Sequence, residues 1–235
     1  MKRTVEAELL DELPPHDHRA IQARRDLQKV NAWMGHARIL ARVLRDAFPD
    51  RPPRSIVELG AGDGTLLLRL AKAMAPQWGP VRAVLVDRQR LLTPQTEHAF
   101  EALSWSVEPV QMDVFDWLDR PRAERSDAFI STLFLHHFAK DDLRRLMGFA
   151  AAQTDLFLAC EPRRRHMSLH AAGLLWVIGC NDVTAHDARI SVRAGFAGDD
   201  LSQLWPVDDR WHVSERPAGG FSHCFCARRI GEAGL

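Results

Sequence analysis

Short apolar runs alternate with amphipathic stretches between residues 54 and 162. The runs "SIVEL", "VRAVLVD", "SVEPVQM", "DAFISTLF" and "DLFLACEP" have the length and composition of buried strands. The stretches between them, "TLLLRLAKAM", "TPQTEHAFEAL" and "KDDLRRLMGFAAAQ", have helical spacing, and Thr93 and Pro94 suit the N-cap and first position of the second helix. This alternation predicts an α/β fold, in which helices cover both faces of a parallel sheet.

Further patterns flank this core. Apolar residues at three- and four-residue spacings predict helices within residues 1–50, interrupted at Gly35. The proline-rich stretch at 49–54 then separates these helices from the first strand. The stretch 163–206 has the pattern of a helical insertion. "RWHVSERPAGGFSHCFCARRI" has two alternating runs and predicts an antiparallel hairpin that turns at residues 217–220.

The composition excludes few classes of function. The 235 residues include 31 Lys plus Arg and 31 Asp plus Glu, so the formal net charge of zero gives no reason to expect a nucleic acid or an anionic membrane as partner. The N-terminus has no apolar run typical of a signal peptide, and no stretch is long enough for a membrane span. The four cysteines show no metal-ligand spacing, so we expect a cytoplasmic protein with reduced thiols.

A glycine-rich turn follows the first predicted strand. "VELGAGDGT" (residues 57–65) places Gly60, Gly62 and Gly64 where the strand becomes a helix, so a ligand can lie against the backbone and its free N–H groups. Asp87 ends the second strand, where a carboxylate can accept hydrogen bonds from ribose hydroxyls. The spacing GxGxG differs from the dinucleotide fingerprint, and Glu58 would repel a pyrophosphate but attract a cationic amino group. A ligand with a ribose and an α-amino acid therefore fits better than NAD.

The stretch "VELGAGDG" resembles motif I of the class I S-adenosylmethionine-dependent methyltransferases, and the resemblance extends over about residues 54–162. It implies a Rossmann-like seven-stranded sheet with a terminal antiparallel hairpin, and S-adenosylmethionine as the cofactor. "DAFISTLFLHHF" (Asp127 to Phe138) is similar to the fourth-strand motif of the UbiE-like small-molecule methyltransferases. The cofactor-binding residues implied by the resemblance are Glu58, Gly60, Ala61, Gly62, Gly64, Asp87, Asp113, Val114 and Ser131.

These positions also have ordinary structural explanations. The glycines can form a tight turn that binds no ligand, and Asp87 can be a solvated carboxylate at a strand end. Asp113 suits the N-cap of the short "VFDWL" helix. A non-catalytic module is a further alternative, although such a module has no need to keep Glu58, Asp87 and Asp113 together.

Methyl transfer to a hydroxyl requires an aligned acceptor and a group that takes the proton. His136 and His137 follow the fourth strand, and His186 lies beside Asp187 in the insertion. Histidine suits this role near neutral pH. The alternatives are packed or backbone-bonded histidines in "LHHF" and an exposed ion pair at His186. We predict no metal site, because the sequence contains no ligand set with a recognised spacing.

The segments added to the common sheet are expected to select the acceptor. We expect residues 1–50 to form a helical lid, and 51–235 to form the cofactor-binding domain with its insertion on the acceptor side. Trp33, Met34 and Trp176 would line an apolar cavity, although ordinary helix packing also accounts for them.

The loop "EPRRR" follows the fifth predicted strand. A solvated basic loop is the simplest explanation for it. Alternatively, Arg163 could pair with a carboxylate or phenolate of the acceptor.

The N-terminal stretch "ELLDELPPHDHRAIQARRDLQKVNAWMGHARIL" is similar to bacterial methyltransferases associated with type III polyketide synthases. This similarity implies a small, aromatic or phenolic, lipid-like acceptor and favours O-methylation. RNA or protein methylation is the alternative; against base methylation, "STLFLHH" lacks the [DNS]PP[YFW] element. We therefore expect a small-molecule acceptor and no nucleic acid. The sequence does not indicate an oligomeric state.

Overall fold

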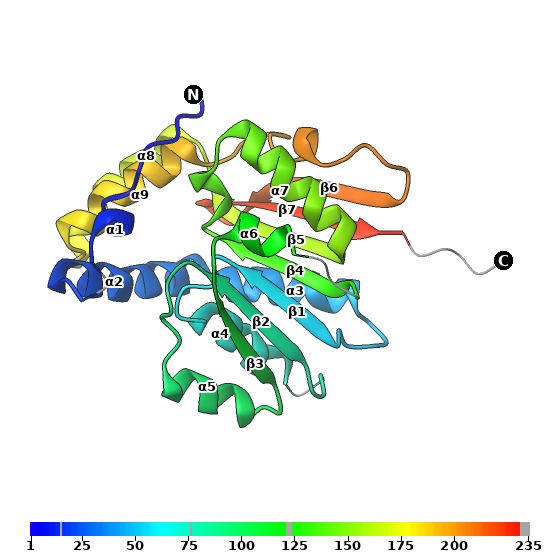
Figure 1. The fold of residues 1–235 in the computed structure, drawn as a ribbon. Coiled ribbons are helices and arrows are strands. Elements are labelled where there is room, and N and C mark those ends of the chain that lie inside the picture. The colour runs from blue at the N-terminus through cyan, green and yellow to red at the C-terminus, as the bar shows by residue number, and fades with distance from the viewer. Residues whose placement is uncertain (15, 76, 121–123, 231–235) are drawn as a thin grey trace.

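The computed structural model describes residues 1–14, 16–75, 77–120 and 124–230, without the side chains of Trp176 and Ile178. The strands in this part of the chain form one seven-stranded sheet in the order β3-β2-β1-β4-β5-β7-β6 (Figure 1). They are β1 (Ser55–Leu59), β2 (Arg82–Asp87), β3 (Ser106–Gln111), β4 (Ser126–Thr132), β5 (Thr154–Pro162), β6 (Trp211–Ala218) and β7 (Ser222–Arg229). Strands β1 to β5 are parallel, and β7 runs antiparallel to β5 and β6. The predicted Rossmann-like sheet with its terminal hairpin is confirmed.

The terminal hairpin turns later than the sequence predicts. Pro217 and Ala218 belong to β6 and pair with His223 and Ser222, so the turn lies beyond residue 218. A proline is tolerated there because β6 is the edge strand and pairs with β7 alone in the described sheet. The expected turn at residues 217–220 therefore begins two residues too early, and the observed turn occupies residues 219–221.

The helices lie in layers on the two faces of the sheet. They are α1 (Leu9–Glu12), α2 (His18–Met34), α3 (His36–Ala47), α4 (Thr65–Met74), α5 (Pro94–Glu101), α6 (Val114–Leu118), α7 (Lys140–Gln153), α8 (His166–Gly173) and α9 (Asp182–Ala194), with 3-10 turns at Leu135–His137, Leu175–Ile178 and Ser202–Leu204. Alternate strand residues point to opposite faces. One set, including Val57 and Phe129, packs with α6 and α7, whereas the other, including Ile56 and Ile130, packs with α3, α4 and α5.

The expected helical lid divides into two parts. Gly35 interrupts it as predicted, with a left-handed φ of 72° between α2 and α3. Leu40, Ala41 and Leu44 of α3 are buried in the core against the sheet, so α3 belongs to the sheet's own helical layer. Helices α1 and α2 instead gather with α8 and α9 on one side of the sheet, at the left of Figure 1.

Two observations bear on the expected cellular environment. All four cysteines are free thiols, and those of Cys160 and Cys224 face each other across β5 and β7. In the part of the chain that the structure describes, no helix combines the length and the apolar character that a membrane span requires.

Candidate functional site

A cavity of about 1100 Å³ lies where the parallel strands end. Open α/β sheets bind their ligands at this edge. The glycine turn and the ends of β2 and β4 line one part of the cavity, and residues 5–11, α2, α8 and α9 line the other. Sequence segments far apart in the chain therefore meet around one volume.

The glycine turn is shaped by two close contacts. Gly60 has a φ of 72°, and a Cβ atom there would lie 2.3 Å from Cδ2 of Phe134. Gly62 also has a positive φ, of 55°, and its N–H donates to Oδ2 of Asp87 at 2.8 Å. No described atom lies within 4 Å of a Cβ built on Gly62, which faces open space. Gly60 thus serves internal packing, whereas Gly62 presents bare backbone.

The predicted carboxylates at the strand ends lie on the cavity. Asp87 lines it, and its Oδ1 accepts a hydrogen bond from the N–H of Gln89 at 2.8 Å. Asp113 and Val114 line it as well. Asp113 is also the N-cap of α6, because its Oδ1 accepts the N–H of Phe115 at 2.8 Å. The N-cap explanation for Asp113 is therefore correct, and it is compatible with a place on the cavity wall.

Glu58 is the unusual group of the glycine turn. Its side chain is buried on β1 and lines the cavity, and its Oε2 has no hydrogen-bond partner among the described residues. Burial raises the pKa of Glu58 well above its ordinary value, and the nearby charges of Asp63 and Asp87 raise it further. A buried carboxylate with an unused oxygen is suited to a cationic amino group, because such a partner would compensate its desolvation.

Other predicted residues have different positions. Trp33 and Met34 line the cavity, and the Trp33 ring packs on Phe221 with a centroid separation of 5.2 Å. Ser131 is buried in β4 and does not line the cavity, whereas the next residue, Thr132, does. Arg163 also lies off the cavity wall, where its backbone N–H donates to Phe221. The side chain of Trp176 lies outside the described structure.

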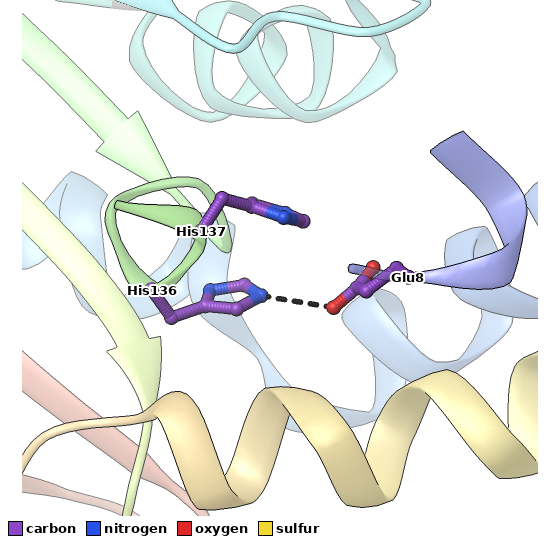
Figure 2. A group of neighbouring side chains, drawn as sticks. All are labelled: Glu8, His136 and His137. Atoms are coloured by element: carbon purple, nitrogen blue, oxygen red, sulfur yellow. Dashed lines mark hydrogen bonds and ion pairs between the residues drawn. The ribbon is translucent and has the colours of Figure 1, made fainter. Parts of the chain in front are cut away.

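The two adjacent histidines lie on the cavity wall beside Glu8 (Figure 2). His136 is 3% exposed, and its Nδ1 lies 2.8 Å from Oε2 of Glu161. Its Nε2 lies 3.3 Å from Oε1 of Glu8. Although burial alone would lower it, hydrogen bonds to both carboxylates raise the pKa of His136 to about 9. His136 therefore bridges two carboxylates from distant parts of the chain.

Glu161 determines the shape of the loop that carries these histidines. It is fully buried at the end of β5, and its Oε1 accepts the N–H groups of Phe134 and Leu135, both at 3.0 Å. The bond to His136 is the main influence that holds the pKa of Glu161 below its ordinary value, against the opposing effect of burial. Leu133, the residue before Phe134, has a φ of 52°, which is uncommon for a bulky side chain. The buried carboxylate thus stabilises a strained loop.

The pKa values of His137 and Glu8 are both lowered, but for different reasons. The ring of His137 lies 4.3 Å from that of His136, and burial, together with the charge of its neighbour, lowers the pKa of His137. Asp11 Oδ2 is 3.6 Å from its Nδ1. Glu8 is 8% exposed, and its hydrogen bond to His136 lowers its pKa to about 2 despite burial.

Residues 1–12, here called the N-terminal segment, are held across the loop after β4 and across α9. The Arg3 side chain donates to the carbonyl oxygens of His136 at 3.1 Å, Phe138 at 2.9 Å and Ala194 at 2.7 Å. Glu8 also accepts a hydrogen bond from the hydroxyl of Ser191 on α9. These contacts place the segment over the part of the cavity that contains the histidines.

His186 is not brought together with the other two histidines. It is half-exposed on α9 and does not line the cavity, and its Nδ1 lies 3.1 Å from Oδ1 of Asp187. Asp187 is buried, and its carboxylate accepts the N–H groups of Leu9 at 2.9 Å and Leu10 at 3.0 Å. Asp187, the acidic partner of the predicted base, therefore holds the N-terminal segment in this structure, and His186 bonds only to Asp187 among the contacts described.

Sequence reasoning missed the two carboxylates that flank His136. Glu161 could have been predicted as a site residue, because it ends a predicted strand at the edge of the sheet where ligands bind. The prediction instead named Arg163, two residues later. Glu8 gave no signal, because 128 residues separate it from His136.

Comparison with known proteins agrees with this arrangement. Residues 56–153 match the family model for a methyltransferase domain. No curated protein matches the chain. Among solved structures, the plantazolicin methyltransferase BpumL in complex with SAH has a TM-score of 0.65 and 11% sequence identity, over 92% of each chain.

Two further structures share the fold. The plantazolicin methyltransferase BamL, in complex with a triazolic desmethylPZN analog and SAH, has a TM-score of 0.62 and 11% identity, over 93% of this chain and 92% of that chain. An O-methyltransferase family protein from Burkholderia thailandensis has a TM-score of 0.54 and 18% identity, over 92% of this chain and 62% of that chain. Identities this low show a common fold and no more. The match to the methyltransferase-domain model covers residues 56–153, which include the glycine turn.

Proposed function

Since the protein is an S-adenosylmethionine-dependent methyltransferase, we propose that it methylates a hydroxyl group of a small, largely apolar acceptor. One observation carries this proposal: the glycine turn, the histidine pair and an apolar wall line the same cavity of about 1100 Å³. That volume is slightly above the roughly 300–1,000 Å³ usual for a single ligand, so it suits a cofactor together with a second molecule.

The cofactor fits the part of the cavity formed by the glycine turn. The unpartnered Oε2 of Glu58 is suited to the amino group of the methionine part, and Asp87 to the ribose hydroxyls. Asp113 and Val114 would border the adenine. The backbone of the turn would lie along the ligand at Gly60, Ala61 and Gly62, which line the cavity. Gly64 does not line it: a Cβ atom there would lie 2.9 Å from Cδ1 of Leu85, so this glycine serves the packing of the turn on the core. Ser131 is too deeply buried in β4 to touch it without a rearrangement, and Thr132 is the better candidate.

When bound, S-adenosylmethionine supplies a methyl group activated by its positive sulfur: the acceptor oxygen bonds to the methyl carbon while the carbon–sulfur bond breaks and leaves its electron pair on sulfur. The chain must align the acceptor, keep water out and receive the hydroxyl proton. His136 and His137 line the cavity and can meet the hydroxyl there. His186 is off the cavity wall, so we assign proton removal to His137, whose pKa is lowered by burial and by the charge of His136. His136 bonds a carboxylate through each ring nitrogen and its raised pKa keeps it protonated, so it positions the loop rather than accepting the proton.

The acceptor side of the cavity has the character expected for an aromatic or lipid-like molecule. Its apolar wall combines side chains of the N-terminal segment, α2 and the insertion: Val5, Leu10, Leu27, Val30, Trp33, Met34, Leu174 and Leu175. Trp33 is 70% exposed although it lines the cavity, so its ring could cover a flat acceptor at little cost. A phenolic polyketide fits this wall better than RNA or a protein surface. We further propose that residues 1–34 act as the lid, since α3 is part of the sheet's helical layer.

The proposal is tested by transfer of labelled methyl from S-adenosylmethionine into a cell extract, separated into organic-soluble, RNA and protein fractions. We expect label in the organic-soluble fraction, where mass spectrometry would identify the acceptor as an O-methyl ether. Asp87→Ala serves as the control, because it should weaken cofactor binding by about 10- to 100-fold, the loss of one or two hydrogen bonds. Label only in RNA or protein would contradict the proposed acceptor class.

A further inference from the structure

We propose that Glu8, His136 and His137 form a binding site for a divalent transition-metal ion of the Zn²⁺ class. The three side chains offer one carboxylate oxygen and two imidazole nitrogens, and these ligand atoms all lie within 4.8 Å of one another (Figure 2). The site goes beyond the proposed methyl transfer and does not require it, although a ring nitrogen that binds an ion cannot also receive the hydroxyl proton.

The separation of the ligand atoms leaves room for an ion between them. The hydrogen bond from His136 Nε2 to Glu8 Oε1, at 3.3 Å, is long beside the roughly 2.7–2.9 Å usual for a charge-assisted one. It matches the distance of about 3.3 Å between two ligands that each lie about 2.0–2.1 Å from a tetrahedral ion. The third ligand, His137, projects into the same space as these two atoms in Figure 2. Small side-chain rotations would close the remaining distances.

An outer carboxylate already holds one ligand in the required orientation. Glu161 accepts from Nδ1 of His136 at 2.8 Å, so this nitrogen carries the proton and Nε2 is directed toward Glu8. Metal-binding histidines usually make such a bond through their second nitrogen. Glu161 is itself held by the N–H groups of Phe134 and Leu135. The direction of the His136 ring is therefore determined before any ion arrives.

The surrounding charges favour a cation. Among the described residues near the histidine pair are the carboxylates of Glu8, Asp11 and Glu161. The imidazolium of His136 also balances them, but its Nε2 proton would be displaced by a bound ion. Two guanidinium groups then compensate the carboxylates only in part: Arg88 lies 3.9 Å from Asp11, and Arg3 binds backbone carbonyls of the histidine loop. Nitrogen ligands with one carboxylate suit Zn²⁺, Co²⁺ or Ni²⁺ better than Mg²⁺ or Ca²⁺, which prefer oxygen ligands.

The position of the site gives the ion a double role. Glu8 belongs to the N-terminal segment and the histidines belong to the loop after β4, so an ion between them would tie the segment to the sheet. All three ligands line the cavity, so the side of the ion away from the protein faces the space assigned to the acceptor. Three protein ligands leave a fourth position open, as in catalytic zinc sites.

The test uses the full-length protein after treatment with a chelator, titrated with Zn²⁺ in a calorimeter and with Co²⁺ in a visible spectrometer. We expect one ion per chain, a cobalt spectrum typical of four-coordinate nitrogen and oxygen ligands, and a rise in melting temperature with Zn²⁺. Mg²⁺ should give none of these signals. These measurements need neither cofactor nor acceptor. If no ion bound, the proposed methyl transfer would be unaffected, and if no methyl transfer were found, the ion-binding measurements would still test the metal site.

Matched variants locate the ion. Glu8→Gln and His137→Asn should each weaken Zn²⁺ binding by at least about 100-fold, and Glu161→Gln by about 10- to 100-fold, the usual effect of an outer partner. His212→Asn, which removes an exposed histidine on the edge strand β6, should bind like the parent protein. Circular dichroism would confirm that the variants fold. Absence of saturable binding in the parent, or equal binding by Glu8→Gln and His212→Asn, would overturn the proposal.

Discussion

The two halves of the cavity are built in different ways. The cofactor half comes from neighbouring strand ends: the glycine turn after β1 and Asp87 at the end of β2, joined by the hydrogen bond from Gly62 to Asp87. The acceptor half joins the N-terminal segment to a loop more than a hundred residues later, through Glu8 and His136. The first half depends on backbone geometry within a common sheet, whereas the second depends on buried charged side chains that must find one another. Local geometry can be recognised in a sequence, and long-range charge pairing cannot.

The largest expected effect is on the acceptor half. Glu161→Ala removes the carboxylate that holds two backbone N–H groups and His136, and leaves these groups buried without a partner. We expect a loss of about 3–5 kcal/mol in the free energy of unfolding, as for one partner of a buried pair. Urea unfolding measures it.

A control for this variant lies on the same strand. Asp155→Ala removes a half-exposed carboxylate that pairs with Arg125 at 3.0 Å, and should cost no more than about 1 kcal/mol. Similar losses for the two variants would mean that the histidine loop does not depend on Glu161, and the contrast between the halves would disappear.

The next effect concerns the contact between the halves. Gly60→Ala would bring a Cβ atom within 2.3 Å of the Phe134 ring, in addition to the strain of a left-handed alanine. We expect it to cost about 2–5 kcal/mol. Gly62→Ala has no such neighbour, so it should cost only about 1–2 kcal/mol and instead weaken cofactor binding.

Urea unfolding and calorimetry with S-adenosylmethionine distinguish the two glycine variants. Gly60→Ala should lose more stability than Gly62→Ala, and Gly62→Ala should lose more cofactor affinity than its loss of stability explains. If Gly62→Ala instead lost the greater stability and bound the cofactor normally, Gly62 would serve only the turn and would not contact a ligand.

The smallest effect is a pH dependence at Glu58. The pKa of Glu58 is raised in the folded protein, so above its ordinary value of 4.5 the unfolded chain loses a proton that the folded chain keeps. The stability of the ligand-free protein should therefore fall as pH rises from about 4.5 toward the raised pKa. Glu58→Gln lacks this fall and should be more stable than the parent at pH 8, by an amount on the order of 1 kcal/mol.

The matching control is the same pair of proteins at pH 4. There Glu58 is largely protonated in both states, so parent and variant should differ little. A stability difference that stays constant between pH 4 and pH 8 would show that Glu58 has the same pKa in the folded and the unfolded protein, contrary to its burial.

The sequence predicted the fold well because the information was local. The helices over residues 65–74 and 140–153 and the strand over 55–59 have the predicted bounds. Apolar periodicity defines each one, and flanking glycine and proline residues also mark the ends of the first helix and of the strand. The hairpin turn was misplaced because proline marks turns in general but is tolerated on an edge strand. Of the cofactor residues predicted in the glycine turn, Glu58, Gly60, Ala61 and Gly62 lie together on the cavity wall for the same local reason, and Gly64 does not.

The acceptor half shows where such reasoning stops. The adjacency of His186 and Asp187 suggested a catalytic pair, but successive helical residues point about 100° apart. As a result Asp187 is buried under the N-terminal segment, while His186 is half-exposed. The sequence contains no recognised metal spacing, because the ion site that we propose would join two adjacent histidines to a carboxylate 128 residues from His136.

The hydrogen bonds that hold the N-terminal segment also have a kinetic consequence. Arg3, Glu8 and the amides of Leu9 and Leu10 together bind the core at several points, so the segment should lift as a unit and only rarely. A methylated product beneath it would depart no faster than the segment opens. We expect turnover to be limited by product departure and to show a burst of product in the first cycle, with an amplitude close to the concentration of enzyme.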